Sequence, residues 1–539
     1  MIEAIRIQNL RSLKDTGFID IKPLTILVGV NSSGKSTFLR SFPLFTQSIK
    51  KNLRGVISWF DESLVDFGNY SIAKNRFAGS SDTIKFSYKI DYKSLRDTYS
   101  YGYFWHGIPF SKKEIKDLEI TISLKYSELD NEEYVNSVYI RINKEHFINF
   151  SISDRNSNVK FKINDTDIHF QKGFLFKNRF GGQVLPYIDS NQESSEDANL
   201  PSIPSSQILR ESGILLHFAN EVIHIMGGSS VKMDERNVKF IIEIFKAWSL
   251  NKEIFLKKIK NLKFYEEIAN NWDVNSIEFE KIYNIIFLQK ITSLLPIVDD
   301  DICRFYTKCS YIAPVRAVAD SRVIRDQNLQ VADIDPEGKN LREFLKSLSA
   351  EQKESYDNFI KKILNIKVEV KTEQTHLSLF ITQANEKFNI TDVGFGYSQI
   401  LPIITKLWWW HEYYGNGNSF KSTLLFEQPE LHLHPAYQAK IADAFINSII
   451  RKDNNSVGAN NKQKSNMNLI VETHSQTIIN RIGRRIYEGF LSPQNVNIVI
   501  FEKNYNEQTS NVRQTTFDKK GKIIDWPRGF FDPLDETLF

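Results

Sequence analysis

Residues 24–40 read LTILVGVNSSGKSTFLR, an apolar run that leads through a glycine-containing loop into a stretch with helical character. The loop matches the phosphate-binding pattern G-x-x-x-x-G-K-[ST] and has the strand–loop–helix context that this pattern requires. Its glycines allow backbone N–H groups to turn inward around phosphates at the positive end of a helix. The sequence therefore predicts a nucleotide-binding lobe of the α/β class.

Each side chain of this loop has an expected task. Lys35 should reach the β- and γ-phosphates of ATP, and the Ser36 hydroxyl should ligate Mg²⁺. The loop alone does not distinguish kinases, GTPases and ATPases, so the class of enzyme has to be inferred from the other motifs. The predicted ATP-contacting residues of the loop are Gly29, Asn31, Ser32, Ser33, Gly34, Lys35, Ser36 and Thr37.

Composition and charge restrict the function classes. With 539 residues, 41% of them hydrophobic and 25% charged, the chain is long enough for a large core and more than one lobe. A formal net charge of +4 permits a local nucleic-acid contact but does not indicate one. The two cysteines lack partners at zinc-site spacing, which indicates reduced structural thiols, as in a cytoplasmic protein.

Targeting and membrane signals are not expected. The opening MIEAIRIQNL has no basic region followed by an apolar stretch, so we expect no secretory signal. The apolar window LPIITKLWWW (401–410) is interrupted by Lys406 and is far shorter than the ~20 residues that span a bilayer. These features favour a cytoplasmic protein without a membrane partner.

The hydrophobic pattern changes twice along the chain before it returns to strands alternating with helices. Segments such as EITISLKYS (119–127) alternate apolar and polar residues, which is typical of an antiparallel sheet with one wet face. Residues 238–248 instead place apolar side chains on one helical face. The predicted parts are an N-terminal lobe of the nucleotide-binding head (1–75), an insertion of strands and then helices (76–310), a C-terminal lobe of the head (311–505) and a terminal segment (506–539).

Two motifs of the C-terminal lobe have features of nucleotide sites. In ITDVGFGYSQILPII (390–404), Gly394, Gly396 and Ser398 precede a helix whose N-terminus can face an anion. In LLFEQPELHLHP (424–435), Glu427 ends an apolar strand, as a carboxylate on the Mg²⁺ side does. Each motif alone also fits an ordinary turn or an ordinary carboxylate.

A third motif, VETHS (471–475), follows on the next expected strand. His474 ends that strand, and Ser475 can cap the helix that comes after it. A surface histidine is the plainer interpretation when the motif is taken by itself. The order of all three motifs after a phosphate-binding loop is much harder to obtain by chance.

That order resembles the ABC-type ATPases, in particular the soluble branch that includes SMC, RecF and OLD proteins. VGFGYSQ stands where that class has its Leu-Ser-Gly-Gly-Gln signature, although its residues differ from that signature. LLFEQPELHLHP is similar to the Walker B and D-loop of OLD-like ATPases, and His474 matches the switch histidine. The resemblance implies an α/β, ABC-type P-loop ATPase head with a mostly parallel sheet, interrupted by a β-rich and then helical insertion.

Two more segments, YIAPVRAVADSRVI (311–324) and GKIIDWPRGFFDPLDETLF (521–539), are similar to a prokaryotic AAA family with a C-terminal domain of unknown function. Relatives include antiviral defence ATPases such as PtuA of Septu, which pair with an HNH nuclease. The resemblance implies ATP and Mg²⁺, a homodimer or higher oligomer that sandwiches ATP, and a nuclease or toxin partner. Arg316 and Arg322 are either anion contacts or ordinary surface arginines.

The expected function is a dimeric, ATP-gated scaffold that regulates such a partner in antiviral defence. The alternative is a RecF- or SMC-like repair ATPase that clamps DNA, which ATP-dependent and salt-sensitive DNA binding would favour. A transporter subunit would need a membrane partner, and the signature and switch histidine disfavour a P-loop kinase. OLD proteins carry a TOPRIM nuclease after the switch histidine, and because residues 475–539 contain no Asp-x-Asp pair, we expect no intrinsic nuclease here.

The residue after Glu427 predicts the rate of the reaction. Gln428 occupies the position of the usual catalytic glutamate, and an amide can orient water but cannot deprotonate it. Glu430 is the nearest spare carboxylate, but Pro429 turns the chain before it. Because general-base help is worth ~10²–10⁴-fold, we expect slow hydrolysis. The predicted catalytic set is Gln428, Glu427 and His474, and the predicted Mg²⁺ ligands are Ser36 and Glu427.

Overall fold

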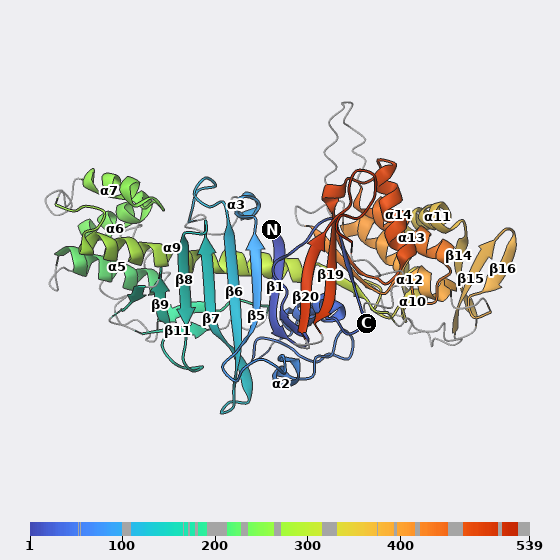
Figure 1. The fold of residues 1–539 in the computed structure, drawn as a ribbon, viewed down its shortest axis with the longest axis horizontal. Helices are drawn as coiled ribbons and strands as arrows, with labels where there is room; N and C mark the ends of the chain where they lie inside the picture. The colour runs from blue at the N-terminus through green and yellow to red at the C-terminus, as the bar shows by residue number, and fades with distance from the viewer. Residues whose placement is uncertain are drawn as a thin grey trace. The chain divides into compact units, whose positions relative to one another are not determined.

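The computed structural model divides into two compact units, whose elements are labelled in Figure 1. One unit comprises Met1, Asn52–Val56 and Ser87–Cys303, and the other comprises Ile2–Lys51, Ile57–Phe86 and Arg304–Phe539. The structure describes residues 1–51, 53, 55–99, 109–164, 166–170, 173–177, 182–190, 213–227, 235–262, 271–314, 331–373, 376–392, 396–414, 421–450, 467–504 and 509–526.

A six-stranded sheet forms the centre of the unit that contains the phosphate-binding loop. Its strand order is β13-β17-β18-β4-β19-β20, with parallel neighbours from β13 to β19 and an antiparallel β20 at the edge. This is the mostly parallel α/β sheet that the sequence predicts. The strands are β13 (Cys309–Ile312), β17 (Ser422–Glu427), β18 (Met467–Glu472), β4 (Leu24–Gly29), β19 (Val496–Asn504) and β20 (Thr509–Thr515).

Helices cover both faces of this sheet, which explains why every residue of β4, β17 and β18 is buried. Side chains such as Ile26, Phe426 and Val471 face one core, which includes residues of the helices from α10 to α14. The alternate positions face α1, which contacts β4, β13, β17 and β18. The helices are α1 (Lys35–Ile49), α10 (Leu341–Ser347), α11 (Ala350–Leu364), α12 (Gly396–Trp409), α13 (Pro435–Ile449) and α14 (Gln476–Tyr487).

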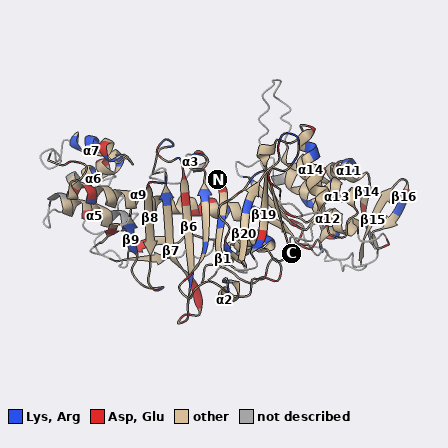
Figure 2. Ribbon diagram, in the orientation of Figure 1, with Lys and Arg blue, Asp and Glu red and all other residues tan. Residues whose placement is uncertain are grey.

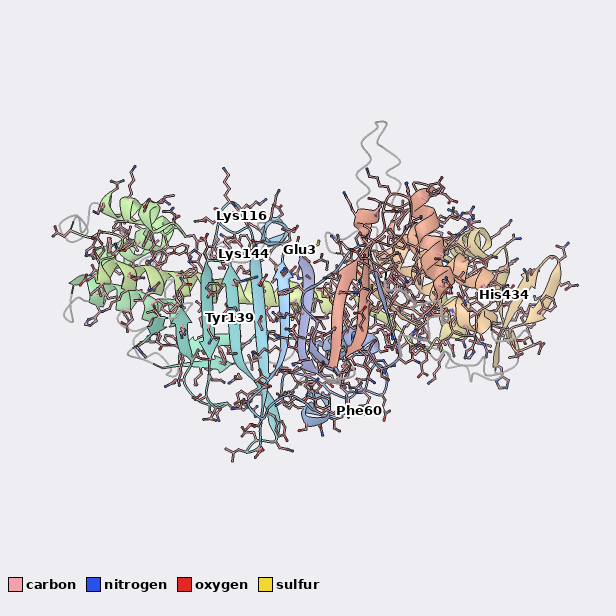
Figure 3. The ribbon with its side chains drawn as sticks, viewed as in Figure 1. Glu3, Phe60, Lys116, Tyr139, Lys144 and His434 are labelled. Carbon is pink, nitrogen blue, oxygen red and sulfur yellow. The ribbon has the colours of Figure 1, made fainter. Side chains whose placement is uncertain are left out.

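Side-chain caps begin α13 and α14, the two helices that follow β17 and β18. The Ser475 hydroxyl accepts a hydrogen bond from Ile478 N at 3.0 Å, as predicted for a cap. His434, labelled in Figure 3, caps α13 because its Nδ1 accepts from Ala436 N at 3.2 Å. The structure therefore gives His434 a structural contact.

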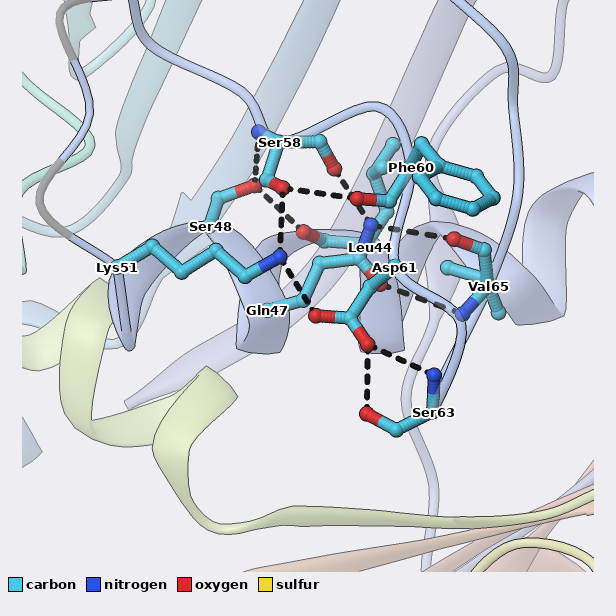
Figure 4. Close-up of polar contacts among 9 residues, drawn as sticks. All are labelled: Leu44, Gln47, Ser48, Lys51, Ser58, Phe60, Asp61, Ser63 and Val65. Carbon is cyan, nitrogen blue, oxygen red and sulfur yellow. Dashed lines mark hydrogen bonds and ion pairs between the residues drawn. The ribbon is translucent and has the colours of Figure 1, made fainter.

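The second half of α1 is fixed to the segment that follows it by a group of polar contacts (Figure 4). The Gln47 amide donates to Val65 O and accepts from Val65 N, both at 3.2 Å. Ser58 N donates to Ser48 Oγ at 2.9 Å, and Lys51 pairs with Asp61 at 2.6 Å. Because Gln47 is almost fully buried, these bonds satisfy backbone groups that water does not reach.

NIKVEVKT (365–372) and LSLFIT (377–382), which the sequence predicts as strands of the parallel sheet, instead lie with a third, short strand in a separate antiparallel sheet. The order is β14-β15-β16, with antiparallel pairing at both steps. The connections between these strands are too short for the crossover that parallel neighbours need, so hairpins are the only geometry available. The strands are β14 (Lys367–Glu373), β15 (His376–Gln383) and β16 (Glu386–Asn389).

A nine-stranded sheet has the order β10-β9-β8-β7-β6-β5-β1-β2, and β3 pairs with β1. Its neighbours from β6 to β10 are antiparallel, and burial alternates along most of β6, β8 and β9, as their sequences predict. Strand β1 belongs to this sheet rather than to that of the phosphate-binding loop. The strands are β1 (Ile2–Leu10), β2 (Leu13–Asp15), β3 (Ile19–Asp20), β5 (Ile84–Ile90), β6 (Leu118–Ser127), β7 (Glu132–Ile142), β8 (His146–Ser151), β9 (Lys160–Ile163) and β10 (Thr166–Ile168).

The described part of residues 213–307 is mostly helical. In α6 the predicted apolar face is buried at Val238, Ile241 and Phe245, whereas Ile242 is partly exposed. Asp234, a residue type that can cap a helix at this position, lies outside the described residues. The basic run in α7 is solvated, with both charge signs along the helix in Figure 2. The remaining elements are α2 (Tyr70–Ala73), α3 (Tyr92–Tyr99), α5 (Gly213–Gly227), α6 (Glu235–Ala247), α7 (Lys252–Lys260), α9 (Ile277–Thr307), β11 (Phe174–Lys177), β12 (Tyr187–Ser190) and the short helices Trp410–Tyr414 and Pro493–Asn495.

Helix α9 passes a length and composition test for crossing a membrane, alone among the helices of the described residues. Its most apolar 18-residue window has a mean hydropathy of 1.2, and 72% of that window is buried within the protein. Core helices pass the same test, and the burial of α9 accounts for its apolar character.

Candidate nucleotide-binding site

The phosphate-binding loop lies between β4 and α1 and needs both of its flanking glycines. Gly29 has φ 152°, and a Cβ there would lie 2.2 Å from Phe501 O. Gly34 has the left-handed φ of 97°, and a Cβ there would lie 2.4 Å from Leu13 Cδ2. Ser32 also has a positive φ, of 59°. The loop is therefore a tight turn that only glycine permits at both ends.

Lys35 is the first residue of α1, and its charged side chain is buried. Its Nζ donates to Val30 O at 2.8 Å, across the loop. Burial lowers the pKa of Lys35, and the nearby carboxylates, led by Glu472, oppose that shift. A bound phosphate would supply the negative charge that a buried ammonium requires.

Ser36 contacts a carboxylate that the sequence analysis did not select. Its hydroxyl donates to Glu472 Oε1 at 2.8 Å. Glu472 is only 1% exposed, and burial together with the neighbouring Glu427 raises its pKa to about 7. Its second oxygen, Oε2, is buried and has no hydrogen-bond partner among the described residues.

Glu427, the expected Mg²⁺-side carboxylate, is paired with an arginine. Arg40 donates to it through Nε at 2.8 Å and Nη2 at 2.7 Å, a bidentate arrangement. The Tyr311 hydroxyl donates to Glu427 Oε2 at 2.5 Å. Burial works against the charge of Arg40, but hydrogen bonds to Glu427 raise the pKa of the guanidinium. The direct partner of Ser36 is thus Glu472 and not Glu427.

Gln428 follows Glu427 in a left-handed conformation, with φ 44°. Its backbone N–H donates to Glu472 O at 2.9 Å, which extends the β17–β18 pairing by one bond. Glu430, two residues later, is also occupied: Thr473 Oγ1 donates to its Oε2 at 2.8 Å, and His474 N donates to its Oε1 at 2.6 Å. Glu430 thus fixes the loop that carries His474.

His474 lines the same hollow as Asn31 of the phosphate-binding loop. Its Nε2 is buried without a hydrogen-bond partner in the described part of the chain. Burial lowers the pKa of His474, and the nearby Lys35 lowers it further. An open hollow of about 600 Å³ is lined by Asn31, Gln428, Glu430, Leu431, His432, Leu433, Gln438, His474, Ser475 and Gln476.

The expected signature residues are not among the residues that line this hollow. Gly396 begins α12 and Ser398 is buried on it, but neither residue lines the hollow. The hydroxyl of Tyr397, between them, donates to Gln383 and accepts from Tyr437. Three other predicted positions, Gly394, Arg316 and Arg322, lie outside the described residues.

Two further carboxylates with a metal-like spacing have structural partners. In VADIDP, Asp333 pairs with the buried Lys406 at 2.7 Å, and Asp335 accepts from backbone N–H groups, including that of Asn340. Nothing among the residues that the structure describes forms a group of three or more His, Cys, Asp or Glu side chains arranged to hold a metal ion.

The site fits a nucleotide and a divalent cation in two observable respects. The glycines leave a cradle that a Cβ would fill, and three buried polar atoms at this site have no hydrogen-bond partner among the described residues: Ser33 Oγ, Glu472 Oε2 and His474 Nε2. Buried polar groups without partners cost free energy, which a ligand can recover. Bound ATP with Mg²⁺ would supply a phosphate chain for Lys35 and a charged centre near Ser36.

Sequence reasoning missed three residues of the site: Arg40, Tyr311 and Glu472. Glu472 carries the same signal that identified Glu427, since each is the last residue of a fully buried strand. Arg40 lies four residues after Ser36 on α1, and hence on the same helical face. The remote Tyr311 carries no comparable local signal.

Together, the strand–loop–helix and the carboxylates at the ends of β17 and β18 define a P-loop ATPase of the α/β class. Residues 1–479 match the model of the AAA ATPase domain family, and the chain belongs to that family. No curated protein matches the sequence.

Solved structures of SMC heads are remotely similar to the chain. A head bound to the C-terminal winged-helix domain of ScpA has 10% identity and a TM-score of 0.36, with 96% of this chain and 98% of that chain covered. A Pyrococcus furiosus head bound to the C-terminal domain of ScpA has 10% identity, a TM-score of 0.35 and 96% coverage of both chains. The Thermotoga maritima SMC head has 8% identity and a TM-score of 0.31, with coverage of 95% and 98%.

Proposed function

We propose that this ATPase binds ATP with Mg²⁺, hydrolyses it slowly and acts as a dimeric, ATP-gated scaffold for a partner nuclease or toxin in prokaryotic antiviral defence. The observation that carries the proposal is that Gln428 and His474 line the same hollow, while both oxygens of Glu430 are hydrogen-bonded elsewhere. An amide there orients water without accepting its proton. ATP therefore persists after binding, which suits a gate.

The open hollow supports dimerisation. In an ATP sandwich, the signature of one protomer faces the phosphate-binding loop of the other. The expected signature residues Gly396 and Ser398 lie outside the lining of the hollow in their own chain. A second protomer that brings its α12 to this hollow would complete the site and exclude water.

The antiviral role is supported by the resemblance of 311–324 and 521–539 to a prokaryotic AAA family whose relatives include PtuA-type defence ATPases. A partner such as an HNH nuclease would contact residues 76–310, the insertion that separates the two lobes of the head in the sequence. The complex would be cytoplasmic, and the ATPase itself would have no nuclease activity. Nucleic acid is a further candidate ligand.

Purified full-length chain tests the gate. We expect light scattering to show a dimer or larger species with ATP, and turnover well below the typical enzyme median of ~10 s⁻¹. Lys35→Ala is the control, since it should abolish the response to ATP. A strict monomer at saturating ATP would overturn the sandwich.

The defence role needs a test in cells. We expect a strain expressing the chain with its neighbouring genes to reduce phage plating, and expect Lys35→Ala to remove that protection. Equal plating with and without the wild-type set would refute the role. ATP-dependent, salt-sensitive binding of duplex DNA by the pure chain would favour the RecF- or SMC-like alternative instead.

A further inference from the structure

Two carboxylates end neighbouring strands at the same level of the parallel sheet. Glu427 of β17 and Glu472 of β18 are Cα partners in the strand register. Side chains at paired positions of adjacent strands point to the same face, and here that face is the one covered by α1. Two carboxylates in this arrangement repel one another unless positive charge lies nearby.

Helix α1 meets the two carboxylates with two different residues. Ser36 and Arg40 are four residues apart, so they lie one above the other on the same helical face. Ser36 contacts Glu472, and Arg40 contacts Glu427 through two hydrogen bonds. The two contacts form parallel connections between α1 and the ends of β18 and β17.

The charge of Glu427 is already balanced within the protein. One of its oxygens accepts from Arg40, and the other accepts from both Arg40 and Tyr311. A cation that took Glu427 as a ligand would have to displace a bidentate guanidinium that is itself partly buried. The pair also fixes α1 to the end of β17.

Glu472 has the opposite character. It is 1% exposed, its Oε1 faces the Ser36 hydroxyl, and its Oε2 is buried without a partner in the described structure. Mg²⁺ prefers oxygen ligands and binds through one or two carboxylates together with substrate phosphates. Strand β18 is also the direct neighbour of β4, whereas β17 is one strand further from the loop.

We propose that Glu472, together with Ser36, forms the magnesium side of the site, and that Glu427 is reserved for anchoring Arg40. The inference rests on the proposed binding of ATP with a divalent cation, but not on slow turnover, dimerisation or any defence role. With the ion bound, the Glu472 carboxylate and the Ser36 hydroxyl would supply its oxygen ligands from the protein, directly or through water.

The test uses Mn²⁺ as the probe and measures free Mn²⁺ by electron paramagnetic resonance, with full-length chain and ADP. We expect Glu472→Gln to weaken Mn²⁺ binding at least about tenfold, a change of about 1.4 kcal/mol. ADP binding in excess EDTA should stay within twofold of wild type. Glu472→Asp, which keeps the charge on a shorter side chain, should retain part of the Mn²⁺ affinity.

Glu427→Gln is the contrasting variant on the adjacent strand. It should lower thermal stability, because Arg40 loses its charged partner, while Mn²⁺ affinity changes less than threefold. A loss of Mn²⁺ binding in Glu427→Gln that equals or exceeds the loss in Glu472→Gln would overturn the assignment. Wild-type chain that binds ADP in EDTA but takes up no Mn²⁺ would overturn it as well, whereas failure to bind ADP would count against the proposed function.

Discussion

The Glu430 carboxylate accepts a 2.6 Å hydrogen bond from the backbone N–H of His474, although the two residues follow different strands. Thr473 adds a second bond to the other oxygen of Glu430. The loop after β17 is thereby tied to the loop that carries His474. The two connected loops also contribute Gln428 and His474 to the lining of the hollow.

Replacing Glu430 with glutamine should loosen this connection. The amide NH₂ cannot accept a hydrogen bond, so one of the two donors, Thr473 Oγ1 or His474 N, loses its acceptor. We expect a destabilisation of about 1–3 kcal/mol, measured as a lower apparent melting temperature. Glu502→Gln, which removes an exposed ion pair with Arg513, is the matched control and should change little. Equal melting temperatures for the two variants would contradict the role of Glu430.

Lys35→Ala should lose ATP affinity. The ammonium is the buried cation of the phosphate-binding loop, and alanine removes its charge from the phosphates. We expect calorimetry to show a Kd for ATP that is at least about tenfold larger, equivalent to about 1.4 kcal/mol of binding free energy. Unchanged affinity in a folded variant would show that the nucleotide binds elsewhere.

Gln428→Glu should hydrolyse ATP faster than wild type. The new carboxylate can accept a proton from water, and general-base catalysis is worth up to ~10²–10⁴-fold in rate. Phosphate release under saturating ATP measures the change, and Gln428→Ala is the companion variant, which should be no faster than wild type. Brisk wild-type turnover that Gln428→Ala leaves intact would show that the base is another residue.

Arg40→Ala should destabilise the nucleotide-binding unit. It leaves the buried Glu427 with Tyr311 as its remaining hydrogen-bond donor among the contacts described above. Breaking a buried ion pair costs about 3–5 kcal/mol, and because Arg40 is about one-third exposed we expect about 1–3 kcal/mol. The double variant Arg40→Ala/Glu427→Gln should recover part of the loss, since no unpaired charge remains. Thermal denaturation of the single and double variants measures both the loss of stability and its partial recovery.

Asp299 should make stability depend on pH in the other unit. Burial raises its pKa to about 6 from an ordinary 3.8, although Val184 N and Leu185 N donate to its Oδ1. Because the folded state binds this proton more tightly, the contribution is fully present below about pH 4 and is lost as pH rises through 6. Asp299→Asn should match wild type near pH 4 and be more stable by about 1–3 kcal/mol at pH 7. A stability difference that does not change with pH would contradict this assignment.

Local sequence patterns were sufficient for much of the fold. The phosphate-binding loop, the strands of the Walker B and histidine motifs, and the Ser475 cap were predictable because each depends on residues adjacent in the chain. The alternating strands from β6 to β9 were predictable for the same reason, since side-chain periodicity reports burial directly. The position of β1 was not, because strand partners are set by contacts far along the chain.

The sequence by itself determined that this protein has a phosphate-binding loop and a carboxylate, Glu427, at the end of an apolar strand; Glu472 carries the same signal, although sequence reasoning did not select it. Only the tertiary structure decided which of them meets Ser36. That outcome depends on β18 lying between β17 and β4, and on α1 placing Ser36 and Arg40 over neighbouring strands. Strand order and helix rotation arise from packing of the whole unit, so no pattern within either motif contains them.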